Sequence, residues 1–350
     1  PGPRALAMYL GTNGLPYPAS ALMGNAFLRA IESPMFFTAN TIDQPGKQIA
    51  LAAHGHWLGG DVDFHEADSW LLVGTQNLRT AISRGMKLIV IDPRRSQTAA
   101  RAAIHLQPRP GEDVTILAGM INFVIREGLC DHAFIEDNVA GFDDLAAAVA
   151  GFTPAYVAER ADVPEDQFID AARLFATYGE RRGMVNAGTG ANFAMHGSLL
   201  EYLCLALTTI CGRWQRAGEK VLRPNTLMPA FTAKAQPHPP YEGWGYGEKL
   251  RMRDLTDTVA GMPTAALADE ILLEGDGQVK ALLCIGGNPM AAWPDQRKTL
   301  RALESLDLLV TLDTEMSLTS RLADYVIAPM MQMETPAMTM GSELIKYYTS

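Results

Sequence analysis

The residues with the clearest chemical potential lie between Leu71 and Val114, where an acidic chain gathers positive charge. Four arginines occur within sixteen positions, just after an apolar run that ends in Asp92, although the formal net charge of the chain is -10. These arginines are Arg94, Arg95, Arg101 and Arg109. A guanidinium group can pair with phosphate, and a carboxylate at a strand end suits the ribose hydroxyls of a nucleotide. The pattern indicates a nucleotide site or, alternatively, an ordinary strand end with a solvated arginine cluster.

The loop "GTQN" (74–77) is a second candidate element, and its first residue precedes Asp92 by 18 positions. Backbone amides at Gly74, Thr75 and Asn77 can face an anion at the N-terminus of the following helix. The loop holds a single glycine, so it is not the G-x-G-x-x-G fingerprint, and "GTGANF" (188–193) is not one either. An NAD-dependent dehydrogenase is therefore disfavoured.

Composition excludes several classes of protein. The 350 residues are 48% hydrophobic and 19% charged, which is typical of a globular chain with two domains. The acidic balance argues against nucleic-acid partners, and no apolar run approaches the roughly 18 residues of a membrane span. The expected location is cytoplasmic, with a periplasmic one left open, because the chain starts at Pro1 rather than Met and its N-terminal part is expected to be missing.

The four cysteines do not form a recognisable site. None of them lies in a C-x-x-C pair, so neither a zinc site, an iron–sulfur site nor a disulfide framework is indicated. They are Cys130, Cys204, Cys211 and Cys284. We expect buried thiols in a reducing compartment.

Short apolar runs alternate with amphipathic segments along most of the chain. The expected strands are 5–10, 70–74, 87–92, 183–188, 279–287, 306–313 and 324–329. The expected helices cover about 19–31, 78–86, the segment that Asp113 begins, and the segment around Phe168 and Phe175. Continuous apolar strands separated by helices predict an α/β protein with mostly parallel sheets. The segment 223–265 is rich in Pro, Gly and Tyr and predicts a long surface excursion.

Five segments together resemble the molybdopterin oxidoreductases, the dimethyl sulfoxide reductase and formate dehydrogenase superfamily. They are "VGTQN" with "GMKLIVIDPRRSQTAARAAIHLQPRPGEDVTILAGM" (73–120), "LCDHAFIEDNVAGFDDL" (129–145), "GTGANFAMHGSLLEYLCLALTTICGRWQRAGEKV" (188–221), "CIGGNPMAAWPD" (284–295) and "LVTLDTEMSLTSRLADYVIAPMMQMET" (309–335). Their order and spacing make the resemblance more specific than any single motif.

The resemblance implies a cofactor and its binding residues. Family members bind molybdenum or tungsten through two pterin dithiolenes, each with a guanosine diphosphate tail, as bis(molybdopterin guanine dinucleotide). Such a polyanion needs local positive charge and amides. The residues implied for one tail are Gly74, Thr75, Asn77, Asp92, Arg94, Gly111 and Asp113, and those for the other are Asn288 and Asp313. Gly190 would approach the pterins. Asp113 could instead be only a helix cap, and Asn288-Pro289 only a turn.

The same resemblance predicts the domain organisation. We expect two doubly wound, mostly parallel-sheet α/β domains, one of them discontinuous. The outer domain would join 1–51 to 195–350, and the inserted domain would cover 52–194. Each domain would bind one guanosine tail.

Departures from the family pattern concern the metal. The resemblance places the metal's usual Cys, selenocysteine or Ser ligand just before a His-Gly pair, and here Ala53 precedes His54-Gly55. Alanine cannot coordinate a metal, so we expect no metal ligand from this chain, with Asp43 as the fallback. A centre without a cysteine ligand suits oxygen-atom transfer better than formate oxidation. His54 and His196 are candidate catalytic residues, although a lone histidine is more often structural.

The expected function is that of the central portion of a molybdenum or tungsten oxidoreductase, inactive alone, that moves two electrons with an oxygen atom or a hydride equivalent. The resemblance implies a missing N-terminal domain with a 4Fe-4S cluster, a missing β-rich C-terminal domain, a small-molecule substrate and an electron-transfer partner subunit. The alternative is a non-catalytic scaffold relative, such as the large iron–sulfur subunit of respiratory complex I.

Overall fold

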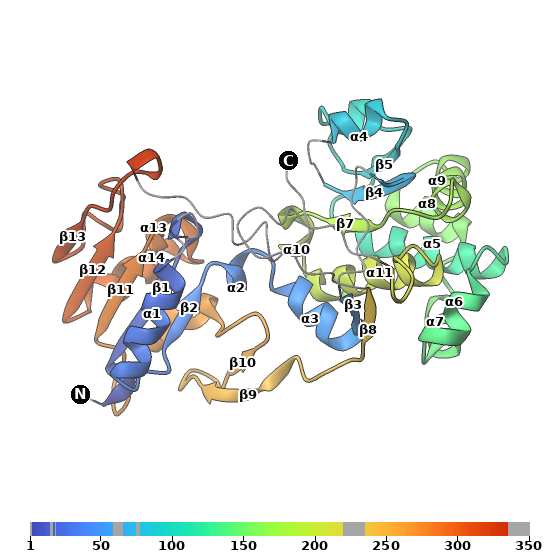
Figure 1. Cartoon of the computed structure of the whole chain (residues 1–350). Coiled ribbons are helices and arrows are strands. Elements are labelled where there is room, and N and C mark those ends of the chain that lie inside the picture. Colours follow the sequence, from blue (N-terminus) through green and yellow to red (C-terminus); the bar gives the residue numbers. More distant parts are fainter. Residues whose placement is uncertain are drawn as a thin grey trace. The chain divides into compact units, whose positions relative to one another are not determined.

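The computed structural model divides the chain into two compact units (Figure 1). It describes residues 2–14, 17, 19–58, 66–74, 78–219 and 235–334. Within these ranges the first unit comprises residues up to Pro45 together with those from Glu242 onward. The second unit comprises Gly46–Tyr241.

The first unit is built on a parallel sheet with the strand order β13-β12-β11-β1-β2. Its strands are β1 (Leu6–Leu10), β2 (Phe36–Thr38), β11 (Ala281–Ile285), β12 (Leu308–Leu312) and β13 (Tyr325–Ile327). Its helices are α1 (Ala19–Ala30), α2 (Asn40–Asp43), α12 (Leu267–Leu272), α13 (Pro289–Ala292) and α14 (Gln296–Glu304), with 3-10 turns at Pro3–Ala5, Thr12–Gly14, Thr264–Ala266 and Gln332–Glu334. Strands β9 (Trp244–Lys249) and β10 (Thr256–Thr258) form a separate antiparallel pair.

Alternating side chains of this sheet point into two cores. Tyr9 and Cys284 are buried in the core that includes residues of α12 and α14, whereas Met8 and Ile285 pack with Leu28 of α1. Strand β13 is different, because it lies at the sheet edge and its Tyr325 is 65% exposed. The apolar run 324–329 therefore forms the predicted strand, but not the buried one that its composition suggested.

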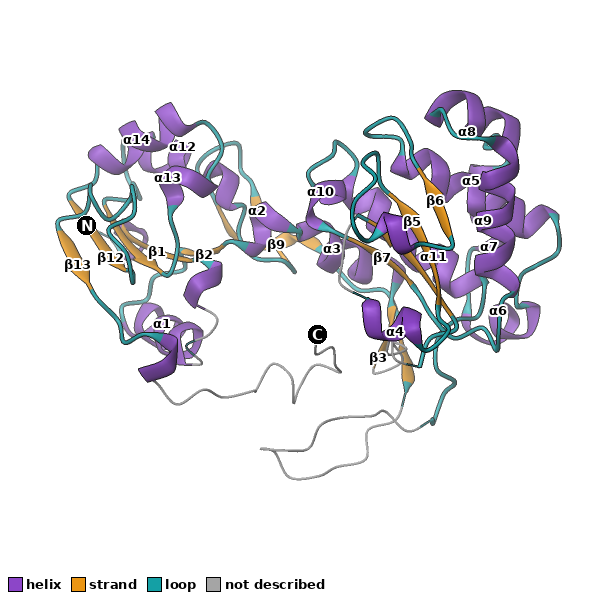
Figure 2. Cartoon of the chain, turned by 90° about the horizontal axis from the view of Figure 1, so that it is seen from above, coloured by secondary structure: helices purple, strands orange, loops and turns teal. Residues whose placement is uncertain are grey.

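The second unit contains a four-stranded parallel sheet with the order β6-β5-β4-β7 (Figure 2). Its strands are β4 (Ser69–Val73), β5 (Lys87–Ile91), β6 (Ile104–Leu106) and β7 (Val185–Ala187). The helices are α3 (Pro45–His54), α4 (Arg79–Ser83), α5 (Asp113–Arg126), α6 (His132–Asn138), α7 (Phe142–Val149), α8 (Pro154–Ala161), α9 (Glu165–Thr177), α10 (Thr189–Asn192) and α11 (Gly197–Ile210), with a 3-10 turn at Ala99–Arg101. Strands β3 (His56–Leu58) and β8 (Gln236–His238) pair antiparallel.

Both faces of this second sheet are covered, as a doubly wound fold requires. Leu71 and Ile89 face the larger core, which contains α5 and α11, and every residue of α5 from Thr115 to Val124 is buried there. Trp70 and neighbouring strand residues face a smaller core with Ala81 of α4. The near-continuous apolar runs of β4 and β5 follow from this burial on both sides.

The predicted fold class, α/β with mostly parallel sheets, is confirmed. The strand "ALAMYL" pairs with β11 and β2, whereas "KLIVID" pairs with β4 and β6 in the other sheet. The unit boundaries differ from the expected 51/52 and 194/195, since the chain crosses between units at Pro45/Gly46 and Tyr241/Glu242. Helix α11 explains the second difference, because it packs on α5 and β7.

The segment 223–265 contains structure that its composition did not predict. Residues 220–234 lie outside the described ranges, but β8, β9 and β10 follow them. Strand β9 has no fully buried side chain, so the apolar alternation that marks a half-buried strand is missing from its sequence. Across the described ranges, no helix combines the length and apolar character needed to cross a bilayer.

Candidate cofactor site

The second unit places two glycines at the point where its strand order reverses. The chain leaves β4 through α4 toward β5, whereas β7 pairs with β4 on the other side. Gly74 and Gly188 follow the carboxyl ends of β4 and β7, and a Cβ added to Gly74 would lie 3.8 Å from the Cα of Gly188. Ligands of open α/β sheets bind at such reversal points. The missing side chains leave backbone exposed to a ligand there.

The first unit repeats this arrangement between β1 and β11. β1 pairs with β2 on one side and with β11 on the other, and the chain continues from β11 to β12 in the opposite direction. Gly11 follows β1, and Gly286 and Gly287 follow β11. A Cβ on Gly11 would collide with the backbone of both other glycines. Each unit therefore has glycines at the strand-order reversal on the carboxyl edge of its sheet, a position that we call its crevice. In the first unit these glycines pack closely on one another.

An aspartate closes the next strand in both units, and both aspartates make the same turn. The Asp92 carboxylate Oδ1 accepts a hydrogen bond from the backbone N–H of Arg94 at 2.8 Å. The Asp313 carboxylate Oδ1 accepts one from the N–H of Glu315 at 3.1 Å. In each case one oxygen fixes the turn, so the side chain is held at the carboxyl edge, one strand away from the glycines.

The similarity continues along the chain with matching offsets. A serine follows each aspartate by four residues, and its hydroxyl accepts a hydrogen bond from the backbone N–H three residues later. Ser96 accepts from Ala99 and Ser317 accepts from Ser320, both at 3.2 Å. The next strand begins twelve residues after the aspartate in both units, at β6 and β13. The two segments share the pattern D-x-x-x-S-x-T, which was visible in the sequence but not recognised.

Asp113, at the start of α5, is electrostatically coupled to Asp92. Burial raises the pKa of Asp113 from the usual 3.8 to about 6; a backbone hydrogen bond opposes this shift, and the charges of Asp92 and Glu112 add to it. Asp92 itself is only 8% exposed. The structure thus brings two predicted residues together as neighbouring carboxylates, an arrangement that suits hydroxyl donors.

We expect Asp113→Asn to stabilise the cofactor-free protein only above its pKa. Because the folded-state pKa exceeds the unfolded value, the ionised carboxylate costs stability, and stability falls as the pH rises from about 4 through about 6. The variant should melt a few degrees higher than wild type at about pH 8 and at the same temperature near pH 4. Thermal scans at both pH values test this. Asp143→Asn, at an exposed site in the first turn of α7, is the control; equal shifts at both pH values would contradict the expectation.

The remaining predicted residues of the second unit surround open space. Arg94 is exposed. Gly111 has a φ of +95°, which favours glycine, and neither it nor Gly190 has any atom within 4 Å of an added Cβ. Thr75 and Asn77 lie outside the described residues.

In the first unit, Asn288 and Asp313 flank the crevice. The Asn288 Oδ1 accepts a hydrogen bond from the Thr319 hydroxyl at 2.8 Å, and this bond ties the loop after β11 to the segment after β12. A small cavity of about 90 Å³ opens beside Asp313, lined also by Gly14 and Gly286. The predicted pair therefore lies on neighbouring loops, with space beside the carboxylate.

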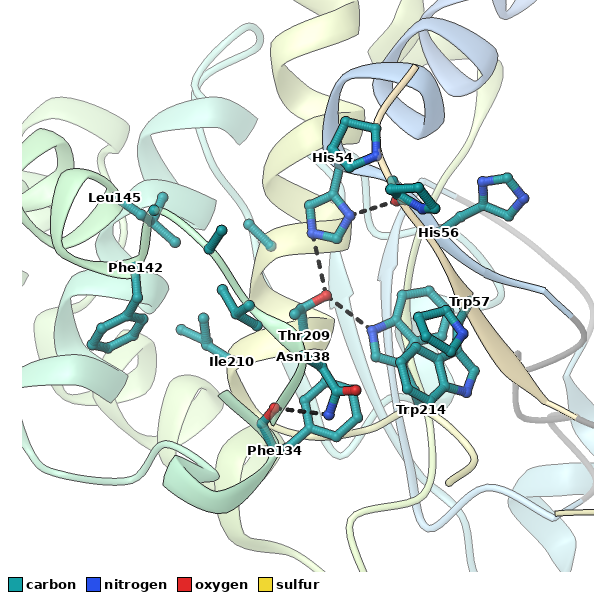
Figure 3. Close-up of a pocket in the computed structure, with 18 of the residues that line it drawn as sticks. His54, His56, Trp57, Phe134, Asn138, Phe142, Leu145, Thr209, Ile210 and Trp214 are labelled. Atoms are coloured by element: carbon teal, nitrogen blue, oxygen red, sulfur yellow. Dashed lines mark hydrogen bonds between the residues drawn. The ribbon is translucent and has the colours of Figure 1, made fainter. Parts of the chain in front are cut away.

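The two candidate catalytic histidines are not brought together. His196 precedes the first turn of α11, whereas His54 contacts Thr209 near its other end, thirteen residues or about 20 Å along the helix. The Nδ1–H of His54 donates to the carbonyl of Gly55 at 2.7 Å, so Nε2 accepts from the Thr209 hydroxyl at 3.2 Å (Figure 3). That hydroxyl accepts from the Trp214 indole at 2.9 Å. Burial lowers the pKa of His54, which favours a neutral ring with one tautomer.

A larger cavity of about 630 Å³ adjoins His54 (Figure 3). Ala53 lines it from the last turn of α3, and α11 lines it through Tyr202 near its middle and Thr209 near its C-terminus. One wall carries the stacked imidazoles of His56 and His238, 4.9 Å apart. Neither Gly74, Gly188 nor Asp92 lines this cavity, so it is distinct from the glycines and aspartate at the carboxyl edge of the sheet.

Two structural features of the crevices escaped the sequence reasoning. Gly11 was not singled out, although a glycine directly after an apolar strand was the available signal. Glu201 is buried on α11, and its carboxylate accepts a hydrogen bond from the Asn192 amide at 2.5 Å. Burial raises the pKa of Glu201. This hydrogen bond fixes α10, which contains Gly190, to α11. No local sequence pattern predicts such a contact.

The geometry is that of a chain with two α/β units, each with glycines at its strand-order reversal and an aspartate after the next strand. The chain belongs to the molybdopterin oxidoreductase family, whose family model matches residues 3–344. The resemblance drawn from the five sequence segments is thereby confirmed.

Known proteins of this family are similar over most of the chain. The F420-dependent formate dehydrogenase subunit alpha of Methanocaldococcus jannaschii is 30% identical over 280 residues, 76% of this chain and 41% of that protein. The molybdopterin-containing subunit of thiosulfate reductase from Salmonella typhimurium is 27% identical over 327 residues, 85% of this chain and 42% of that protein.

A solved structure shares the fold. Acetylene hydratase from Pelobacter acetylenicus superimposes with a TM-score of 0.75 and 22% identity, covering 97% of this chain and 51% of that one. The chain thus spans about two fifths of these curated relatives and about half of the hydratase chain.

Proposed function

We propose that this chain is the cofactor-holding centre of a molybdopterin oxidoreductase that binds bis(molybdopterin guanine dinucleotide), one guanosine tail in each unit. The observation that supports the proposal most is that the same arrangement occurs at the carboxyl edge of the sheet in both units. Both units have glycines at the strand-order reversal, followed one strand away by an aspartate in the same turn. One nucleotide would require one such edge; two edges fit a cofactor with two tails.

The residues present fit the group. In the second unit, the nearest described atom to a Cβ added at Gly74 or Gly188 lies 3.6 Å away, so a diphosphate could approach the backbone there. In the first unit, Gly11 and Gly286 instead pack closely against neighbouring backbone. Asp92 and Asp313 each use Oδ1 for the local turn, and Asp92 retains Oδ2 for ribose hydroxyls. Arg94 is exposed beside the first of them and can pair with phosphate. In the first unit, the position that corresponds to Arg94 is Glu315, so the two sheet edges differ in charge.

The chain's own contribution would be binding, orientation and electrostatics. When bound, the cofactor supplies the two-electron redox chemistry. Asp92 and Asp113 would orient one ribose, Asp313 and Asn288 the other, and Gly190 would leave room for the pterin. His54, with both ring nitrogens already bonded, suits a positioning role, whereas His196 is exposed and could contact a substrate.

The alternative, a scaffold relative without a cofactor, rests on Ala53. This residue is exposed on the last turn of α3, at the position to which the resemblance assigns the metal's side-chain ligand. Its methyl group cannot bind a metal. The duplicated aspartate turns favour the first function, because a scaffold has no need to keep two sets of ribose acceptors.

Metal analysis and X-ray absorption of the full-length protein test the proposal. We expect molybdenum or tungsten with sulfur ligands from the pterins alone, and an unchanged spectrum in Asp43→Ala, because no side chain of this chain is expected to ligate the metal. A metal-free protein would support the scaffold alternative. A further sulfur ligand, or a changed oxygen shell in Asp43→Ala, would show instead that a side chain coordinates the metal.

A further inference from the structure

The 630 Å³ cavity beside His54 has a volume typical of sites for small organic molecules. All its lining residues belong to the second unit, and they come from α3, β3, the α6–α7 region, α11 and the segment around β8. It lies away from the crevice between β4 and β7, and neither the aspartates nor the glycines of that crevice line it. The cavity therefore has room for a ligand other than the nucleotide tail.

Aromatic rings form much of the cavity wall. Trp57 and Trp214 are 7% and 6% exposed, so both indoles are held rigidly within the fold. Phe134 packs against Trp57 with ring centroids 5.3 Å apart, and Tyr202 packs edge-on against His54 at 5.6 Å. Indole faces attract cations more strongly than other aromatic rings do.

The charges around the cavity have one sign. Among the described residues that line it there is neither a lysine nor an arginine, whereas Glu136 and Asp137 are present and exposed. Arg216 stacks on the Phe134 ring at 4.9 Å, but its guanidinium pairs with Asp131 at 2.7 Å. Among the described lining residues, an anion entering the cavity would find no lysine or arginine to pair with.

The imidazoles do not reverse this balance. Burial lowers the pKa of His54, and burial together with His238 and His54 lowers the pKa of His56. Both rings therefore stay neutral at neutral pH. The Thr209 hydroxyl is already engaged with His54 and Trp214.

From the cavity, its aromatic wall and its acidic rim, we propose that the second unit binds a monovalent organic cation with an aromatic or alkyl body, next to Ala53 and His54. The indoles hold the body and attract the charge, and the carboxylates of Glu136 and Asp137 favour entry of a cation over an anion. The cavity adjoins Ala53, the position to which the resemblance assigns the metal ligand, so the proposal adds a second ligand to the proposed function; binding of the cation itself is measured without metal.

Three probes of nearly equal shape and different charge test the proposal on the full-length protein. Isothermal titration should rank benzylammonium first, benzyl alcohol second and benzoate last, with benzylammonium at least tenfold tighter than benzoate. Ala53→Phe, an exposed position whose new ring fills the cavity, should weaken benzylammonium at least tenfold. Ala155→Phe, at an exposed site on α8 away from the cavity, should leave its binding unchanged.

A second pair of variants separates charge from shape. Glu136→Gln combined with Asp137→Asn should reduce the preference for benzylammonium over benzyl alcohol severalfold, without weakening benzyl alcohol. The proposal is overturned if benzoate binds as tightly as benzylammonium, if none of the probes binds at millimolar concentration, or if Ala53→Phe binds benzylammonium like wild type. These readouts are independent of metal content, so a metal-free protein that binds benzylammonium would contradict only the proposed function.

Discussion

Replacing Asp92 by asparagine should strip most of the cofactor from the full-length protein. Asparagine keeps the Oδ1 acceptor that holds the turn to Arg94 at 2.8 Å, but it puts an amide where the second oxygen would accept ribose hydroxyls. A hydrogen bond to a charged group contributes about 1.5–3 kcal/mol, or roughly ten- to a hundredfold in affinity. Metal and guanosine monophosphate contents of the purified variant should fall by at least about tenfold.

Asp313→Asn is the matched variant in the other unit, where the same turn holds Glu315. If both edges hold a guanosine tail, both substitutions should lower cofactor content, with the smaller effect at Asp313, whose Oδ2 already accepts from the Ser320 hydroxyl at 3.4 Å. Asp143→Asn, exposed on α7, should leave the cofactor content at the wild-type value. A variant that keeps the wild-type content of metal and guanosine monophosphate would show that its aspartate does not bind the cofactor. Loss of cofactor in only one of the two variants would indicate a single nucleotide site.

Gly190→Val should also lower cofactor content, while the fold keeps its stability. Among the described residues, no atom lies within 4 Å of a Cβ added at Gly190, and its backbone is not in the left-handed region. Valine therefore meets none of these atoms, and a ligand in that space would oppose it. Overpacking typically costs about 1–3 kcal/mol, roughly ten- to a hundredfold in affinity. Metal content and thermal melting of the same preparations measure both effects.

Gly151→Val supplies the control for this steric argument. Gly151 lies between α7 and α8, and an added Cβ there also has no neighbour within 4 Å. Its variant should keep both the melting temperature and the metal. If Gly190→Val retained its full metal content, the pterin would not occupy the space beside α10.

Much of the fold follows from the sequence because its strands are buried on both faces. The runs "WLLVG" and "KLIVID" became β4 and β5 with little change in bounds, since a doubly covered parallel strand is apolar at every position. Strand β9 could not be found this way, because glycines and exposed residues replace the alternation. The expected outer domain included residues 197–210, whereas α11 packs on α5 and β7, because an apolar helix does not reveal which sheet it covers.

The residues of the candidate site likewise fall into those that local sequence predicts and those that depend on contacts between distant segments. Asp92 and Asp313 were predicted because each ends an apolar run, where local sequence carries the signal. Gly11 and Glu201 depend on contacts between distant segments, with Gly286 and Asn192 respectively, and spacing along the chain does not report such contacts. The cavity beside His54 likewise forms only when α3, α6 and α11 pack together.

The ratio of guanosine monophosphate to metal in full-length wild-type protein tests the two-edge site most directly. Acid hydrolysis would release the nucleotide, and the metal would be counted in the same sample. Two guanosine monophosphates per molybdenum or tungsten atom are expected, one from the edge at Asp92 and one from the edge at Asp313. A ratio of one, or purified protein with neither nucleotide nor metal, would contradict the assignment of a guanosine tail to each unit.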